Sequence, residues 1–167
     1  MTCEQETILG RILFIGMVIL LLINARSYAV AGELPDLKLT PGAINPDVTQ
    51  ENIHQTICIR GYAESTLPPA SYTNRIKKRQ MRLYYYADHN PRNYKEDHLI
   101  SLSIGGNPTD PKNLWPEPRY GKWNAEKKVL LEKKLHDLIC HGKLPLATAQ
   151  KEIATNWIRA YKKYIGR

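Results

Sequence analysis

The sequence predicts an α+β fold, in which a short antiparallel hairpin leads into a helix and further helices surround both. Two long segments, residues 123–140 and 146–164, carry apolar residues at helical spacing. Before them, two short apolar segments lie on either side of a Gly105-Gly106 turn, which is typical of a hairpin. No internal repeat or low-complexity tract interrupts this order.

The first 31 residues are typical of a signal peptide. Arg11 precedes an almost wholly apolar run over residues 12–25, and Ala29-Val30-Ala31 is a typical cleavage pattern. The run has about 14 residues, fewer than the roughly 20 that span a bilayer, and a retained membrane anchor is the alternative. We therefore expect an exported protein, periplasmic or secreted from a bacterial envelope, with no stable membrane association after cleavage.

Cleavage would leave 136 of the 167 residues, enough for one compact domain. Residues 32–46 are rich in proline and glycine without periodicity and predict a flexible leader, and residues 47–167 form the single domain. The full net charge of +8 stays on this part, because the first 31 residues hold two acids and two bases. The charge favours a polyanion, nucleic acid first and an anionic membrane or cell-wall polymer second, over a merely soluble basic surface.

Cys58 and Cys140 are the only cysteines beyond residue 31. In an oxidising compartment an isolated pair predicts one disulfide bond, and two buried free thiols are the alternative. Zinc binding is disfavoured because the sequence has no C-x-x-C spacing.

The elements before the hairpin are predicted from caps and periodicity. Thr49 can cap a short helix that reaches Cys58. The segment 61–69 contains a proline pair and should be extended or turned. Residues 71–84 show one apolar helical stripe, and the following tyrosines could stack on bases, although packing is their more usual role.

The other face of the helical segment 71–84 is strongly basic. Its basic residues are Arg75, Lys77, Lys78, Arg79 and Arg82. Such a face can follow a phosphate backbone, which would make binding strongly dependent on salt. The alternative is a solvated face beneath an apolar stripe. We expect Arg75, Lys78 and Arg79 to bind substrate.

The centre of the chain is predicted to be strand, loop, strand and helix. Alternation over residues 95–103 is irregular, although His98, Ile100 and Leu102 share one parity. A short return strand over residues 113–115 should be stopped by the prolines at 116 and 118. The helix over residues 123–140 has a wide apolar stripe and ends at Gly142.

This centre carries the residues suited to chemistry. Asp97 and His98 supply a carboxylate and an imidazole, and Asn113 and Asn124 supply amides. The order suits a phosphodiesterase site with one metal ion. The net positive charge indicates a function only in combination with these four residues.

The segment 96–106, with Asn113-Leu114 and Asn124 after it, resembles the HNH family of ββα-metal nucleases. His98, Asn113 and Asn124 match its three ordered positions in the H-N-N variant, and the chain as a whole resembles small exported bacterial HNH-type proteins. The resemblance implies a ββα-metal (HNH-like) core with additional flanking helices.

The resemblance also implies roles for these residues. His98 would be the general base, for which its ordinary pKa of about 6.5 is suitable. Asp97 and Asn124 would be metal ligands, and Asn113 would orient the His98 loop by hydrogen bonding. Asp97 and His98 point to opposite sides of an ideal strand, so a distortion must bring both to one ion.

The predicted ligands are hard oxygen donors, which makes Mg²⁺ the first choice and Mn²⁺ the second. The metal ion would neutralise charge on the scissile phosphate. Lys127 could contact a phosphate, and an exposed helical lysine is the alternative reading.

These observations together predict an exported metal-dependent endonuclease that hydrolyses phosphodiester bonds of DNA, with RNA as a further substrate. Its specificity for sequence should be low, because no helix-turn-helix, zinc finger or repeat is present. The alternative is a non-catalytic periplasmic or surface protein of HNH-like fold that binds nucleic acid or another polyanion. A structural envelope protein is a third possibility.

Overall fold

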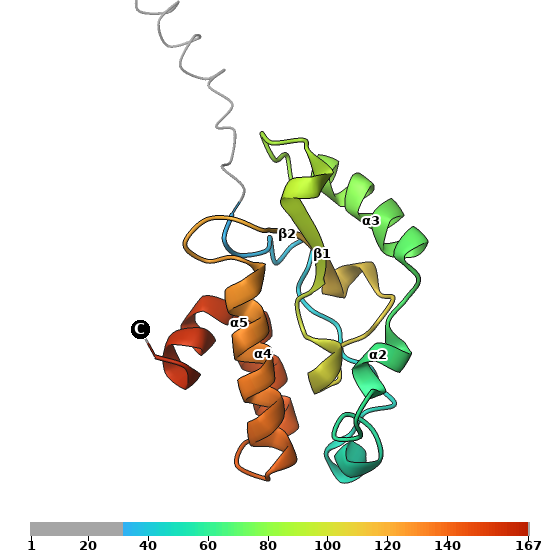
Figure 1. Ribbon diagram of the computed structural model, residues 1–167, viewed down its shortest axis with the longest axis vertical. Helices are drawn as coiled ribbons and strands as arrows, with labels where there is room; N and C mark the ends of the chain where they lie inside the picture. The colour runs from blue at the N-terminus through green and yellow to red at the C-terminus, as the bar shows by residue number, and fades with distance from the viewer. Residues whose placement is uncertain (1–31, 167) are drawn as a thin grey trace, which may run out of the picture.

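The computed structural model describes residues 32–166, and the predicted signal peptide lies outside them. The elements of this part are η1 (Gln50–Gln55), α2 (Tyr62–Thr66), α3 (Ala70–Leu83), η2 (Pro91–Asn93), β1 (Tyr94–His98), η3 (Leu102–Ile104), η4 (Pro111–Asn113), β2 (Leu114–Pro118), α4 (Ala125–Cys140) and α5 (Leu146–Tyr164). The two strands form one antiparallel sheet. In Figure 1, α2 and α3 lie on one side of this hairpin and α4 and α5 on the other. The α+β class is therefore confirmed.

The hairpin differs from the prediction at both strands. β1 begins at Tyr94 and ends at His98, which pairs with Leu114. β2 continues through Pro116 and Pro118, so the expectation that these prolines stop the strand was wrong.

The two prolines are tolerated because β2 has only one partner strand. The Leu99 N–H donates to the Asn113 carbonyl (2.7 Å), and the Arg119 N–H donates to the Asn93 carbonyl (3.0 Å). The backbone N–H and C=O groups of odd-numbered residues in β2 therefore point towards β1. The backbone nitrogens of residues 116 and 118 point away from β1, so a proline at these positions costs no hydrogen bond between the strands.

The helices pack through the stripes that the sequence predicts. Leu131, Leu135 and Ile139 on α4 are fully buried against Ile153 and Trp157 on α5. A second cluster of buried residues lies between α3 and the hairpin. Its members are Met81, Tyr84, Tyr86, Tyr94, Leu99 and Trp115. The hairpin is thus held from both sides.

The predicted disulfide is present. Cys58 and Cys140 are joined with an S–S distance of 1.98 Å and lie 82 positions apart in the chain. The bond fixes the segment after η1 to the end of α4. Within residues 32–166, no helix is long and apolar enough to cross a membrane.

Residues 32–46, predicted as a loose leader, have no regular helix or strand but are bonded to the domain. The buried Thr40 hydroxyl donates to the Leu114 carbonyl (3.0 Å), and the Trp157 indole N–H donates to the Glu33 carbonyl (3.0 Å). Ile44 forms a bridge with Gly106 at the turn between the strands. The segment is therefore part of the fold.

Two earlier segments also differ from the prediction. The segment 61–69 contains the short helix α2, because its two prolines follow the helix and leave the preceding turn free. The helix after Thr49 is a 3₁₀ helix that ends at Gln55.

Candidate functional site

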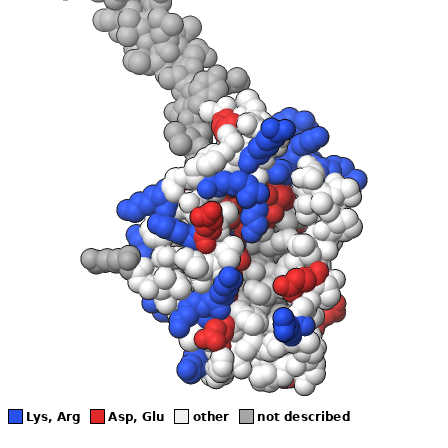
Figure 2. Space-filling model, viewed as in Figure 1, with Lys and Arg blue, Asp and Glu red and all other residues white. Residues whose placement is uncertain are grey.

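Asp97 and His98 end β1 and turn to opposite sides, as strand geometry predicts. Asp97 bonds to Lys128 on α4, whereas the His98 ring reaches the carbonyl of Pro108 in the loop between the strands. Both residues line a hollow of about 430 Å³ along the free edge of β1. Residues from α2, α3 and α4 complete its walls. Figure 2 shows a hollow near the centre of this face, with Lys and Arg side chains above it.

The His98 ring is held in one tautomer. Its Nε2 atom lies 2.9 Å from the Pro108 carbonyl oxygen, which can only accept, so Nε2 carries the proton. Burial lowers the pKa of His98, which favours the neutral ring. The Nδ1 atom then keeps its lone pair and can take a proton from another group. This is the protonation state that a general base needs.

A buried cluster of charges joins β1 to α4. The Lys128 ammonium lies 2.6 Å from Asp97 Oδ2 and 2.8 Å from the His98 carbonyl oxygen, and it also bonds the Glu132 carboxylate. The Lys95 ammonium lies 2.5 Å from Asp97 Oδ1. Lys128 thus directs its three protons at three oxygen atoms. Asp97 has an ammonium group on each oxygen.

Asp97 and Lys128 are both ionised at neutral pH. Burial by itself raises the pKa of Asp97, but Lys128 and Lys95 outweigh it and hold the pKa well below its ordinary range. Burial by itself lowers the pKa of Lys128, and the carboxylates of Asp97 and Glu132 more than reverse this. A buried ion pair of this kind is stable only while both partners are present.

Glu96 and Glu117 are two further carboxylates whose oxygens are buried without a hydrogen-bond partner in the described part of the chain. Burial raises the pKa of Glu96 to about 8, although Lys77 opposes the shift. Burial also raises the pKa of Glu117 well above its ordinary value. Glu96, which lines the same hollow as His98, is therefore mostly protonated at neutral pH.

Asn113 is fully buried and binds several segments at once. Its amide oxygen accepts from Ile100 N–H (2.9 Å), and its NH₂ group donates to the carbonyls of Ile100 and Asn107 (both 2.9 Å). These bonds fix the chain just after His98 and the loop just before Pro108. They are the contacts expected of a residue that orients the His98 loop, and its effect on catalysis stays a prediction.

Asn124 is the N-cap of α4. Its amide oxygen accepts from Lys127 N–H (3.2 Å), and its NH₂ group donates to the Gly121 carbonyl (3.3 Å). Among the described hydrogen bonds it shares no partner with Asp97. The structure therefore gives these two predicted ligands separate tasks, one in a helix cap and one in the buried charge cluster.

The residues present do not fit a divalent cation without rearrangement. Within residues 32–166, no group of three or more His, Cys, Asp or Glu side chains is arranged to hold a metal ion. The oxygens of Asp97, Glu132 and the His98 carbonyl already converge on the Lys128 ammonium. A metal ion could use them only after Lys128 had moved.

The predicted substrate-binding residues lie on two helices. Arg75, Lys78 and Arg79 are exposed on α3 and line a second hollow of about 560 Å³. Lys127 lies on α4, with its ammonium 4.8 Å from the centre of the Trp123 ring. Figure 2 shows basic side chains gathered over α3 at the upper right. Three of the four residues are therefore brought together on one face.

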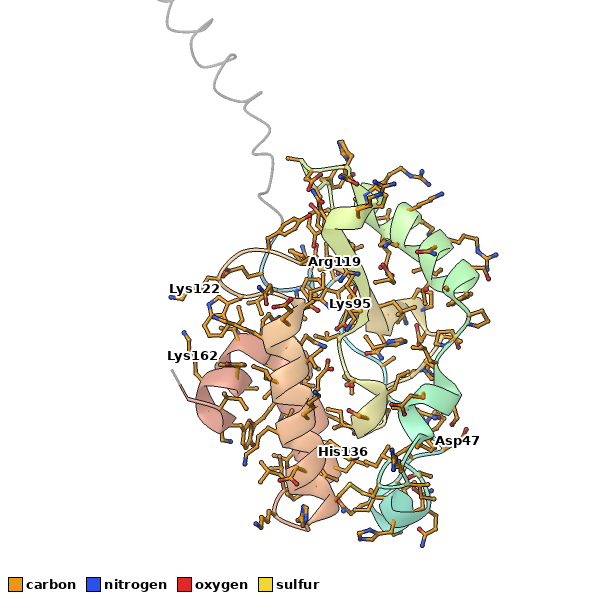
Figure 3. The ribbon with its side chains drawn as sticks, in the orientation of Figure 1. Asp47, Lys95, Arg119, Lys122, His136 and Lys162 are labelled. Atoms are coloured by element: carbon orange, nitrogen blue, oxygen red, sulfur yellow. A yellow bond between two sulfur atoms is a disulfide. The ribbon has the colours of Figure 1, made fainter. Side chains whose placement is uncertain are left out.

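The prediction from sequence missed Lys95, Lys128 and Glu132. A signal was available, because Asn124, Lys128 and Glu132 follow one another at intervals of four and share one face of the predicted helix. Alternation along β1 likewise places Lys95 beside Asp97. Figure 3 shows Lys95 and Arg119 close together at the hairpin, whereas Lys122 and Lys162 lie farther out near the start of α4.

Comparison with known proteins identifies no relative: no family model, curated protein or solved structure matches this chain.

Proposed function

We propose that this protein is an exported endonuclease that hydrolyses phosphodiester bonds of DNA, and also of RNA, with low sequence specificity. The observation that carries the proposal is the anchored His98 ring, whose Nε2–H is bonded to the Pro108 carbonyl while the ring lines an open hollow. A neutral imidazole held in this way can remove a proton from water.

His98 Nδ1 takes one proton from a water molecule, and the water oxygen forms a bond to the phosphorus atom. The bond from phosphorus to one ester oxygen breaks, and that oxygen leaves with a proton from the solvent or from a neighbouring acid. The imidazolium then returns its proton to the solvent, which restores the neutral ring. Lys95 also lines the hollow, and its side chain is 35% exposed, so its positive charge can stabilise the negative charge of the phosphate.

We also propose dependence on Mg²⁺, or on Mn²⁺ as the second choice, although such an ion could use the Asp97 oxygens only after Lys128 had moved. A divalent ion would supply charge neutralisation at the phosphate. Because Asp97 is paired with Lys128 and Asn124 caps α4, the steps above use only the chain's own residues.

A second candidate is a non-catalytic protein that binds nucleic acid or another polyanion. The observation in its favour is the Lys128 ammonium, which already neutralises the carboxylate that a metal ion would need. In this reading the buried cluster stabilises the fold, and the net charge of +8 supplies the binding.

Plasmid cleavage separates the two candidates. The purified, disulfide-bonded protein is incubated with plasmid and Mg²⁺, with and without EDTA, beside the variants His98→Ala and His141→Ala. The nuclease proposal predicts cleavage that falls by about 10²-fold or more in His98→Ala. His141 is exposed at the end of α4, so its variant should cleave like the wild type. The same reactions are run with a single-stranded oligonucleotide. If wild type and His98→Ala both shift the plasmid and the oligonucleotide on a gel but leave both intact, the protein is the binder.

A further inference from the structure

Tyr85, the second residue beyond the end of α3, has an unusual conformation. Its φ of +51° makes it the only non-glycine residue with a positive φ in residues 32–166. This left-handed position after a helix is usually taken by glycine or asparagine, because a β-carbon there is strained. The backbone conformation therefore does not explain why residue 85 is a tyrosine.

Packing does not account for Tyr85 either. Its side chain is 79% exposed, whereas its neighbours Tyr84 and Tyr86 are buried in the core between α3 and the hairpin. The Tyr86 ring stacks on Tyr94 with 5.0 Å between ring centres. Tyr85 is thus a strained residue that presents a large aromatic ring to the solvent.

Helix α3, which ends two residues before Tyr85, carries the basic face. Arg75, Lys78, Arg79 and Arg82 are exposed at helical spacing and line one hollow with Ser71 and Asn74. No acidic side chain lines this hollow. None of the four cations forms an ion pair with a residue of the described part. Four such cations match the repeating charge of a phosphate backbone.

The basic face and Tyr85 follow one another along the chain. The Tyr85 N–H donates to the Arg82 carbonyl at 3.3 Å, so the backbone of Tyr85 lies one turn beyond the last arginine of the face. At the other end of α3, Ala70 and Thr73 line the hollow that contains His98. The helix has 14 residues and is about 20 Å long, so one extended strand lying along it would meet both features.

We propose that the partner of this face is single-stranded nucleic acid, with its phosphates along α3 and an unpaired base stacked on Tyr85. In a duplex the faces of the bases are covered by their neighbours, whereas in a single strand they are free to stack on an aromatic ring. This inference names the substrate class of the proposed nuclease, and it rests on that proposal only for the cleavage step.

Binding is measured by fluorescence anisotropy with a labelled oligothymidine of about 15 nucleotides and with a duplex of the same length, in EDTA and low salt. The wild type should bind the single strand more tightly. Tyr85→Gly should raise its Kd by about tenfold and leave that of the duplex unchanged. The same variant should melt at a temperature about 4 °C higher, because glycine removes the strain.

Two variants and one ligand serve as controls. Tyr85→Phe keeps the ring and should bind like the wild type. Tyr120→Ala, at another exposed tyrosine (55%), should also leave binding unchanged. Inorganic polyphosphate has charge but no bases, so its affinity should be the same for wild type and Tyr85→Gly.

Equal weakening for the single strand, the duplex and polyphosphate, or no weakening in Tyr85→Gly, would overturn the stacking role. If plasmid cleavage persists in that case, the nuclease proposal survives alone. If Tyr85→Gly loses single-strand binding but the wild type cleaves neither the plasmid nor the oligothymidine in Mg²⁺, the stacking role survives and the nuclease proposal fails.

Discussion

Lys128 is the residue on which the buried charges beside His98 depend. It is fully buried, and its ammonium bonds Asp97, Glu132 and the His98 carbonyl. Removing one partner of a buried ion pair strongly destabilises a protein, because the other charge stays buried without compensation. Lys128 therefore links the stability of the fold to the position of the candidate general base.

We predict that Lys128→Met lowers the free energy of unfolding by about 3–5 kcal/mol, because it leaves Asp97 and Glu132 buried without their shared cation. Urea denaturation measures the change. Lys133→Met, at an exposed position of the same helix, should change the free energy by less than about 0.5 kcal/mol. Similar small losses in both variants would show that the cluster contributes little.

Glu96 predicts a dependence of stability on pH. The pKa of Glu96 is about 8 in the fold against an ordinary value of 4.5, mainly because of burial. Between these values the folded state holds a proton that the unfolded state has lost. The contribution of Glu96 to the unfolding free energy therefore falls as pH rises from about 4.5 to about 8.

Glu96→Gln removes this titration, and the variant should be more stable than the wild type at about pH 9, with the difference shrinking towards about pH 4. Denaturation curves across this range test the prediction. Glu126→Gln, at an exposed glutamate of α4, is the control and should follow the wild type. Parallel curves for wild type and Glu96→Gln would contradict the assignment.

Variants of α3 test whether binding depends on the position of its basic residues or only on the net charge of the protein. If Arg75 and Arg79 each contact a phosphate of a single strand, the double variant Arg75→Gln/Arg79→Gln should reduce the slope of log Kd against log salt by about 1.4. Lys133→Gln/Lys134→Gln on α4 removes the same net charge and should change the slope less. Titrations at several salt concentrations measure both, and equal slopes for the two double variants would exclude a specific role for α3.

The helices could be predicted from sequence because their signal is local. Leu131, Leu135 and Ile139 lie at intervals of four, and burial of one face is enough to define the helix. The partner of Asp97 could not be predicted in this way, since it depends on how α4 packs against β1. The prediction that Pro116 stops the strand was wrong for a related reason, because the effect of a proline depends on which edge of β2 is paired.

The same limit applies to the predicted site. Asp97, His98 and Asn113 were identified as residues of interest, and the structure gives each a defined set of bonds near the hollow. The amide oxygen of Asn124 suits a metal ligand, but at the start of α4 the same oxygen caps the helix. Residue type and order thus predict candidates, whereas the packing of helices decides which of them meet.

The molecule as a whole depends on one covalent link between distant segments. In the chain-entropy model, a disulfide that closes a loop of 82 residues stabilises the fold by about 4–5 kcal/mol. We predict a loss of this size in Cys58→Ser/Cys140→Ser, measured by urea denaturation. Wild type treated with a reductant should match the double variant, and the variant itself should not respond to the reductant.

The position of this disulfide has a consequence for how the protein withstands proteases. Asp97, His98, Asn113 and Lys128 all lie between Cys58 and Cys140, inside a covalent ring. A protease that nicks any loop of the ring leaves both pieces tethered, so the nicked chain should run as one band until a gel sample is reduced. Where proteases are abundant, the candidate site can therefore stay assembled after the backbone has been cut.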